Sequence, residues 1–211
     1  MRRLPVYLLL DTSGSMSGEP IEAVKNGVQL MISKLRQNPQ AQETAFISVL
    51  TFDSSAKQII PLCDLSSFQM VDIKASGLTS LGDALKTVSQ CIDREITKTT
   101  ANTKGDWKPI VFILTDGIPT DNWLSGLAEF KKRKTAFTVA CAAGTSADTH
   151  VLKQITENVL RMDTDMDSIE KFFDWVTASI VVTSSTVEDS GKEIMTLNEL
   201  PPPPSQLNIV S

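Results

Sequence analysis

Three short polar segments of the chain carry oxygen donors in positions where they could form a metal site. They are residues 11–15 (Asp-Thr-Ser-Gly-Ser), Thr79, and residues 115–117 (Thr-Asp-Gly). The first and third directly follow apolar runs that we expect to be buried parallel strands, and the second precedes an amphipathic helix. Their candidate donors are two carboxylates (Asp11 and Asp116) and three hydroxyls (Ser13, Ser15 and Thr79), with no imidazole or thiolate among them. Such an all-oxygen set is typical of a small, hard dication such as Mg²⁺.

The order and spacing of these donors resemble a known family. Asp11-x-Ser13-x-Ser15, Thr79 and Asp116 are similar to the five-point metal-ion-dependent adhesion site of von Willebrand factor A domains. The resemblance covers roughly residues 4–184. It implies that these five residues surround one divalent cation, Mg²⁺ or alternatively Mn²⁺ or Ca²⁺. It also implies that an Asp or Glu of a partner protein completes the coordination.

A narrower resemblance concerns the setting of the protein. The opening at residues 8–16 (Leu-Leu-Leu-Asp-Thr-Ser-Gly-Ser-Met), the chain length and the proline-rich end are similar to the small bacterial TerY-like proteins. This resemblance implies a tellurite-resistance or stress-response system, with a kinase or phosphatase of that system as a possible partner. The link to such a system rests on the overall resemblance and not on any single residue.

Apolar residues close to the third segment are expected to form the rim of a partner-binding surface. Ile118 and Pro119 follow Asp116 directly, and Trp123 lies a few residues further on. Trp123 is equally well interpreted as a core residue at the start of a helix. We therefore predict a rim made of Ile118, Pro119 and Trp123.

Two other functions are compatible with parts of the pattern. A Mg²⁺-dependent phosphatase-like enzyme would carry an aspartate nucleophile followed by a second carboxylate two residues later, where this chain has Ser13. No GxxxxGK[ST] motif is present, and the chain has one histidine, His150, so no Ser-His-Asp set is assembled. We expect no catalytic residues. A metal-gated switch would act through the last helix, expected at residues 169–183, and the tail that follows.

Composition restricts the class of protein. The chain has 211 residues and a net charge of -5, which disfavours nucleic-acid binding. Its three cysteines form no CxxC pair, and we expect a reduced, cytoplasmic protein. The apolar run after Arg2 and Arg3 is short, contains Pro5, and is interpreted as a strand rather than a signal sequence. No segment is apolar over the length of a membrane span. The basic cluster at residues 131–134 is interpreted as a solvated helix end.

Hydrophobic periodicity predicts an α/β fold. Strands are expected at residues 6–10, 45–52, 56–62, 110–114, 136–142 and 159–162. Helices are expected from Pro20 to a stop at Asn38-Pro39, and at residues 81–96, 123–134, 147–156 and 169–183. This alternation predicts a Rossmann-like, doubly wound, mostly parallel six-stranded sheet with helices on both faces. The short second connection makes the third strand antiparallel at the edge, and the resemblance implies the order 3-2-1-4-5-6. We assign residues 1–184 to the domain and 185–211 to a polar and proline-rich tail.

Overall fold

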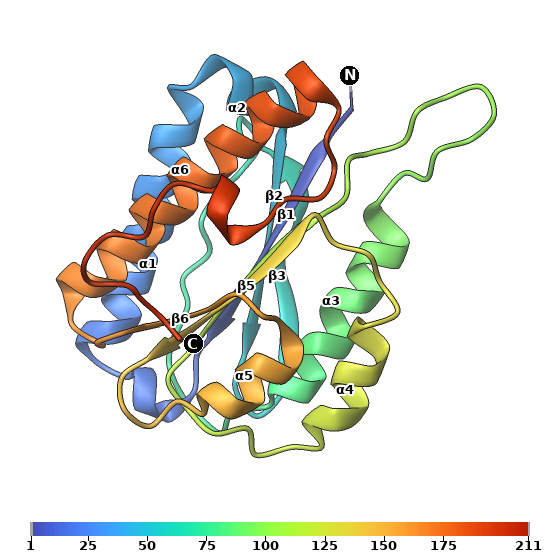
Figure 1. Cartoon of the computed structure of the whole chain (residues 1–211). Coiled ribbons are helices and arrows are strands. Elements are labelled where there is room, and N and C mark those ends of the chain that lie inside the picture. The colour runs from blue at the N-terminus through green and yellow to red at the C-terminus, as the bar shows by residue number, and fades with distance from the viewer. Residues whose placement is uncertain (1, 211) are drawn as a thin grey trace.

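A computed structural model describes residues 2–210 of the chain as a twisted sheet covered by helices on both faces (Figure 1). The sheet has seven strands in the order β3-β2-β1-β4-β5-β6-β7. Strands β3 and β7 are antiparallel to their neighbours, and the other pairs are parallel. The strands are β1 (Leu4–Asp11), β2 (Ala45–Phe52), β3 (Ala56–Asp64), β4 (Ile110–Thr115), β5 (Phe137–Ala143), β6 (Val159–Met162) and β7 (Asn208–Ile209). The expected order and the antiparallel edge strand β3 are confirmed, and β7 is an addition.

The helices form two layers (Figure 1). The longer ones on one face are α1 (Glu19–Arg36) and α6 (Met166–Ser190), with the short α2 (Pro39–Thr44) beside them. The other face carries α3 (Leu81–Glu95), α4 (Trp123–Phe130) and α5 (Thr149–Ile155). Two single 3₁₀ turns, η1 (Gly14–Met16) and η2 (Leu197–Glu199), complete the elements. Within residues 2–210, no helix has both the length and the apolar character needed to cross a bilayer.

The central strands are apolar on both sides, because each side of the sheet is covered. In β1, Val6, Leu8 and Leu10 belong to the core beneath α1 and α6. Tyr7 and Leu9 belong to the core beneath α3 and α4. This double burial explains why the strand has a continuous apolar run rather than an alternating one.

The register between β1 and β4 positions the polar segments that follow them. Leu10 lies opposite Leu114, so Asp11 and Thr115, the last residues of the two strands, lie at the same level. The first turn after β1 and the loop after β4 therefore start side by side. This is the edge of a parallel sheet, at the carboxyl ends of the strands, where α/β proteins bind their ligands.

Two helix boundaries differ from the sequence expectations. Asn38-Pro39 ends α1 but also begins α2, since the Asn38 side chain accepts a hydrogen bond from the Ala41 N–H at 2.9 Å and Pro39 occupies the first helical position. Helix α4 ends at Phe130, so residues 131–134 lie beyond it rather than in its last turn.

The largest difference lies at the C-terminal end. The last helix was expected to end at residue 183, but α6 continues to Ser190, and the boundary at 184 falls within it. The segment after α6 then packs on the domain: Met195, Leu200 and Leu207 are buried, and Trp175 donates a hydrogen bond from Nε1 to Pro201 O at 2.8 Å. Strand β7 extends the sheet beyond β6. The proline-rich segment therefore lies against the domain.

Replacing Trp175 with Phe is expected to loosen this C-terminal segment. The change removes the hydrogen bond to Pro201 but keeps an aromatic ring against Phe112, whose ring centre lies 6.2 Å from that of Trp175. We expect a loss of about 1 kcal/mol in the free energy of unfolding. Hydrogen exchange should become faster at the Leu207 and Val210 amides, with the β4 amides as the internal control. Unchanged exchange at both amides would contradict this role for Trp175.

Candidate metal centre

The carboxylate of Asp11 is held in place at the end of β1. Asp11 has no exposed surface. Its Oδ1 accepts a hydrogen bond from the Ser13 N–H at 2.8 Å, and its Oδ2 accepts one from Thr115 Oγ1 at 2.5 Å. The first bond closes a local turn around the loop, and the second joins the two neighbouring strand ends. Both oxygens of Asp11 are thus oriented before any ligand binds.

A chain of hydroxyls connects this turn to the second carboxylate. The Oγ atoms of Ser13 and Ser15 lie 3.0 Å apart, and Ser15 Oγ donates to Asp116 Oδ1 at 2.7 Å. Ser13 is buried, whereas Ser15 is exposed. Asp116, one residue beyond β4, is 7% exposed. The predicted donors Asp11, Ser13, Ser15 and Asp116 therefore lie together, with their open side toward Ser15.

Thr79 reaches the same place from the loop before α3. Its hydroxyl is close to Gly117, because a Cβ atom built on that glycine would lie 2.8 Å from Thr79 Oγ1. Backbone hydrogen bonds join this loop to the turn after β1, from the Gly14 N–H to Gly77 O at 3.1 Å and from the Ser76 N–H to Thr12 O at 2.8 Å. The structure thus brings all three predicted segments to one point, and glycine at 117 leaves room for Thr79.

The electrostatics of the two carboxylates favour a cation. Burial raises the pKa of Asp11, and the nearby charge of Asp116 adds to this effect. The hydrogen bonds from Thr115 and Ser13 lower the pKa, but the net shift is upward. Burial likewise raises the pKa of Asp116. Neither residue forms an ion pair with a Lys, Arg or His of the described chain. Two buried acids with only neutral partners are unfavourable unless they are protonated or meet a positive charge. The donor set therefore fits a hard dication.

Two supporting residues had no role in the sequence prediction. Thr115 orients Asp11. From the sequence it is named only within residues 115–117, and the signal available for its role was the expected adjacency of the two strands. Asp121, from the loop after β4, accepts hydrogen bonds from the Gly82 N–H at 3.0 Å and the Asp83 N–H at 2.8 Å. It caps the first turn of α3 from another segment, which no local sequence pattern reveals. Asp121 thereby couples the loop of Asp116 to that of Thr79.

Exposed apolar side chains flank the opening of the site. Ile118 is 61% exposed, and Leu78, which the sequence prediction did not name, is 58% exposed. Pro119 is half-buried, and half-buried Trp123 packs against the core on the α3 side. A pocket of about 200 Å³ adjoins Ser15 and Asp116 on the side of residues 143–146. Leu78 lies between Gly77 and Thr79, directly next to a predicted metal-site donor.

Comparison with known proteins identifies the family of this fold and site. The model of the von Willebrand factor type A domain matches residues 6–175. A Synechocystis sp. protein of uncharacterised function is 32% identical over 123 residues, covering 55% of this chain and 26% of that protein. A von Willebrand factor A domain-containing protein of Dictyostelium discoideum is 26% identical over 171 residues, covering 76% of this chain and 18% of that protein. This chain thus spans about a quarter or less of the length of these curated relatives.

A solved structure supports the same assignment at the level of the fold. Proximal thread matrix protein 1 of the mussel byssus, in a form described as having a zinc-occupied metal-ion-dependent adhesion site, superposes with a TM-score of 0.63 at 20% identity. The match covers 87% of this chain and 46% of the mussel protein. Since the family model covers most of the chain and the sheet has the expected strand order, the chain belongs to the von Willebrand factor type A domain family.

Proposed function

We propose that this chain is a non-catalytic protein-interaction module that holds a divalent cation between Asp11, Ser13, Ser15, Thr79 and Asp116. The cation coordinates an Asp or Glu of a partner protein. The observation that carries the proposal is the pair of buried carboxylates, Asp11 and Asp116. Each accepts a hydrogen bond from a hydroxyl, and neither has a basic partner among the described residues. A dication would neutralise both, and the three hydroxyls are neutral donors that leave it able to attract a further anion.

The residues around the ion have separate tasks in this proposal. Asp11 is fixed by Thr115 and the Ser13 N–H, so it holds one side of the ion in a set direction. Asp116 is bound by Ser15 at the open side of the site. The exposed side chains of Leu78 and Ile118 add apolar contact area around an incoming acidic residue. An acidic side chain set among apolar neighbours is therefore the partner chemistry we propose.

We propose Mg²⁺ as the ion, with Mn²⁺ and Ca²⁺ as alternatives, because all donors are oxygens. Zn²⁺ is tested as well because the mussel protein is described with zinc in its adhesion site, although zinc sites usually include nitrogen or sulfur ligands. We place the protein in the cytoplasm, in a TerY-like tellurite-resistance or stress-response system, with a kinase or phosphatase of that system as partner. The free thiols of Cys63, Cys91 and Cys141 support a reducing compartment.

Partner capture with a metal-dependent bait tests this function. Wild type and Asp11→Ala are immobilised and exposed to lysate of the source organism, each with Mg²⁺ and with EDTA. We expect one or more proteins to be retained by wild type with Mg²⁺ and lost in the other three conditions. Repeating the capture with Mn²⁺, Ca²⁺ and Zn²⁺ ranks the ions.

Asp189→Ala is the matched control for this experiment. Asp189 is exposed near the end of α6, so the variant removes one negative charge far from the site. It should capture the same proteins as wild type. Equal retention by every bait, with or without metal, would refute metal-bridged binding. Release of phosphate from an aryl phosphate that requires both Asp11 and Mg²⁺ would instead support the phosphatase-like alternative.

A further inference from the structure

A second pocket lies at the end of the sheet opposite the candidate metal centre. It has a volume of about 320 Å³, at the lower end of the range for small-molecule sites. Its walls come from the end of α3, from residues 97–99 and 106–109 before β4, and from residues 132–134 before β5. The loop between α3 and β4 projects from the domain beside it (Figure 1). Because β4 and β5 begin here and end at the other edge, this pocket is separate from the metal centre.

One part of the pocket is apolar. Ile92 and Ile96 come from α3 and its C-cap, and Trp107 and Pro109 come from the segment before β4. Ile92 and Trp107 are almost fully buried. The indole N–H of Trp107 is buried and has no hydrogen-bond partner among the described residues. Buried donors are normally satisfied, so an acceptor on a ligand that reaches the indole would remove a deficit.

The rest of the pocket is strongly basic, in a protein whose net charge is -5. The cationic lining residues are Lys98, Lys108, Lys132, Arg133 and Lys134. The acidic lining residues, Asp93 and Asp106, are already paired, with Arg133 at 2.5 Å and with Arg3 at 2.5 Å. Lys108 pairs with Glu193 at 3.7 Å, and Lys132 pairs with Glu129 at 2.7 Å. Lys134 forms no ion pair in the described chain, and Lys98 lies close enough to Asp93 to lower the pKa of Asp93 without forming a salt bridge. The pocket therefore has positive charge that the protein itself does not neutralise.

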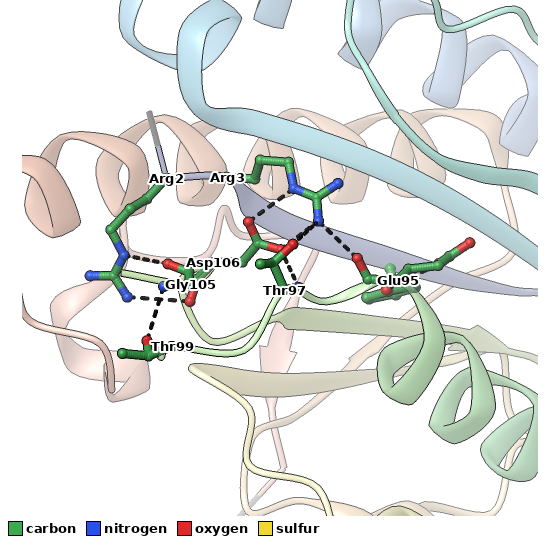
Figure 2. Close-up of polar contacts among 8 residues, drawn as sticks. Arg2, Arg3, Glu95, Thr97, Thr99, Gly105 and Asp106 are labelled. Atoms are coloured by element: carbon green, nitrogen blue, oxygen red, sulfur yellow. Dashed lines mark hydrogen bonds and ion pairs between the residues drawn. The ribbon is translucent and has the colours of Figure 1, made fainter. Parts of the chain in front are cut away.

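The wall beside this pocket is fixed by two arginines at the start of the chain. Figure 2 shows Arg3 binding the Asp106 carboxylate through Nε at 2.9 Å and Nη2 at 2.5 Å. Arg3 also donates to Glu95 O at 2.8 Å, and Asp106 accepts from the Thr97 N–H at 2.7 Å. Arg2 donates to Gly105 O at 2.7 Å. Its guanidinium also stacks over Trp107, with Cζ 3.3 Å from the ring centre. The end of α3 and the base of the loop are thus tied to the two residues just before β1, which preorganises the pocket.

We propose that this pocket binds a small organic anion, with an aromatic or other apolar body against Ile92, Ile96 and Pro109 and a phosphate or carboxylate group among Lys98, Lys108 and Lys134. Each half of this chemistry has its own support: the buried apolar wall and the ammonium groups of Lys98 and Lys134, which no salt bridge of the described chain neutralises. The volume matches a small molecule rather than a helix or strand of a partner. This site is independent of the metal-dependent function.

Titration with simple probes tests the proposal on the full chain. Phenyl phosphate, benzoate, inorganic phosphate and benzyl alcohol are added in metal-free buffer while ¹H–¹⁵N amide spectra are recorded. We expect saturable shifts for phenyl phosphate at residues 96–99, 107–108 and 132–134, with a Kd on the order of 1 mM. Inorganic phosphate and benzyl alcohol, which each lack one half of the chemistry, should bind at least about tenfold more weakly.

Two double variants of equal charge separate a built site from general attraction. Lys98→Ala with Lys134→Ala should weaken phenyl phosphate binding by about tenfold or more. Lys104→Ala with Lys131→Ala removes two exposed lysines outside the pocket lining and should leave the Kd within about twofold. Equal weakening by both pairs, absence of saturation, or shifts centred on residues 11–15 and 116 would overturn the proposal. None of these outcomes depends on whether metal bridges a partner.

Discussion

Asp116→Asn is expected to raise the melting temperature of the metal-free protein and to abolish its stabilisation by Mg²⁺. In the metal-free state, Asp11 and Asp116 are both buried, and each is surrounded by hydroxyls and amides rather than by basic side chains. The substitution removes one buried charge and its repulsion with the other. Asn is close to isosteric, and its Oδ1 can still accept the hydrogen bond from Ser15. We expect a gain of about 1–2 kcal/mol in metal-free stability.

Magnesium should reverse the ranking of the two proteins. At a Mg²⁺ concentration of about 100 times Kd, wild type should gain about 2.7 kcal/mol, since only the folded state holds the complete site. For a chain of this size, each kcal/mol corresponds to about 2–4 °C in Tm. Asp116→Asn should gain almost nothing. Thermal unfolding with EDTA and with a Mg²⁺ series measures both effects, and Asp189→Asn serves as the surface control.

Two results would contradict this account. A lower metal-free Tm for Asp116→Asn would mean that the Asp116 charge is stabilising in the apo state, which requires a cationic partner other than the metal. An equal Mg²⁺ response in wild type and variant would mean that Asp116 is not part of the ion site. Either outcome would also remove the main support for metal-bridged partner binding.

The placement of the candidate site could be predicted from the sequence because its residues follow easily recognised elements. The apolar runs before Asp11 and Asp116 are strongly patterned, and the two strands are neighbours in the sheet, as the resemblance implied. What the sequence did not reveal is the set of contacts between segments that hold the ligands in place. Asp121 caps α3 from 39 residues away in the sequence. The exposure of Leu78 depends on how the loop before α3 folds over the domain. Such contacts depend on tertiary placement rather than on local pattern.

The C-terminal end was predicted less well for a different reason. Residues 183–190 are rich in hydroxyls, and residues from 185 onward were assigned to a polar tail. In the structure the hydroxyls of this stretch other than that of Ser184 donate to the carbonyl four residues earlier, as Thr183 Oγ1 does to Ser179 O at 2.7 Å and Thr186 Oγ1 does to Val182 O at 2.8 Å. Such bonds satisfy the hydroxyls within the helix. The proline run that follows is held by Trp175, a contact that composition alone does not encode.

Gly126→Ala is expected to destabilise the fold and to weaken the metal site together. Gly126 in α4 packs directly on the first turn of α3, so that a Cβ atom would lie 2.1 Å from Gly82 O and 2.7 Å from Gly82 Cα. These are backbone atoms and cannot rotate away, so α4 must move off α3. The higher helix propensity of Ala offsets only about 1 kcal/mol of this cost. We expect a net loss of about 2–4 kcal/mol in unfolding free energy.

The same displacement should be felt at the ion, because α3 and α4 follow the two loops that carry Thr79 and Asp116. Gly27→Ala is the matched comparison: its Cβ would lie 2.2 Å from the buried ring of Phe173, in the α1–α6 layer. It should destabilise the protein without changing the affinity of the folded state for Mg²⁺, whereas Gly126→Ala should weaken that affinity by about tenfold. Ser125→Ala, an exposed change in α4, should leave both quantities unchanged.

Denaturant unfolding measures the stability of these variants, and Mg²⁺ titration by calorimetry measures the affinity of the folded state separately. If Gly126→Ala and Gly27→Ala lowered Mg²⁺ affinity equally, the loss would reflect general destabilisation, and the packing of α4 on α3 would have no special role in positioning the ligands.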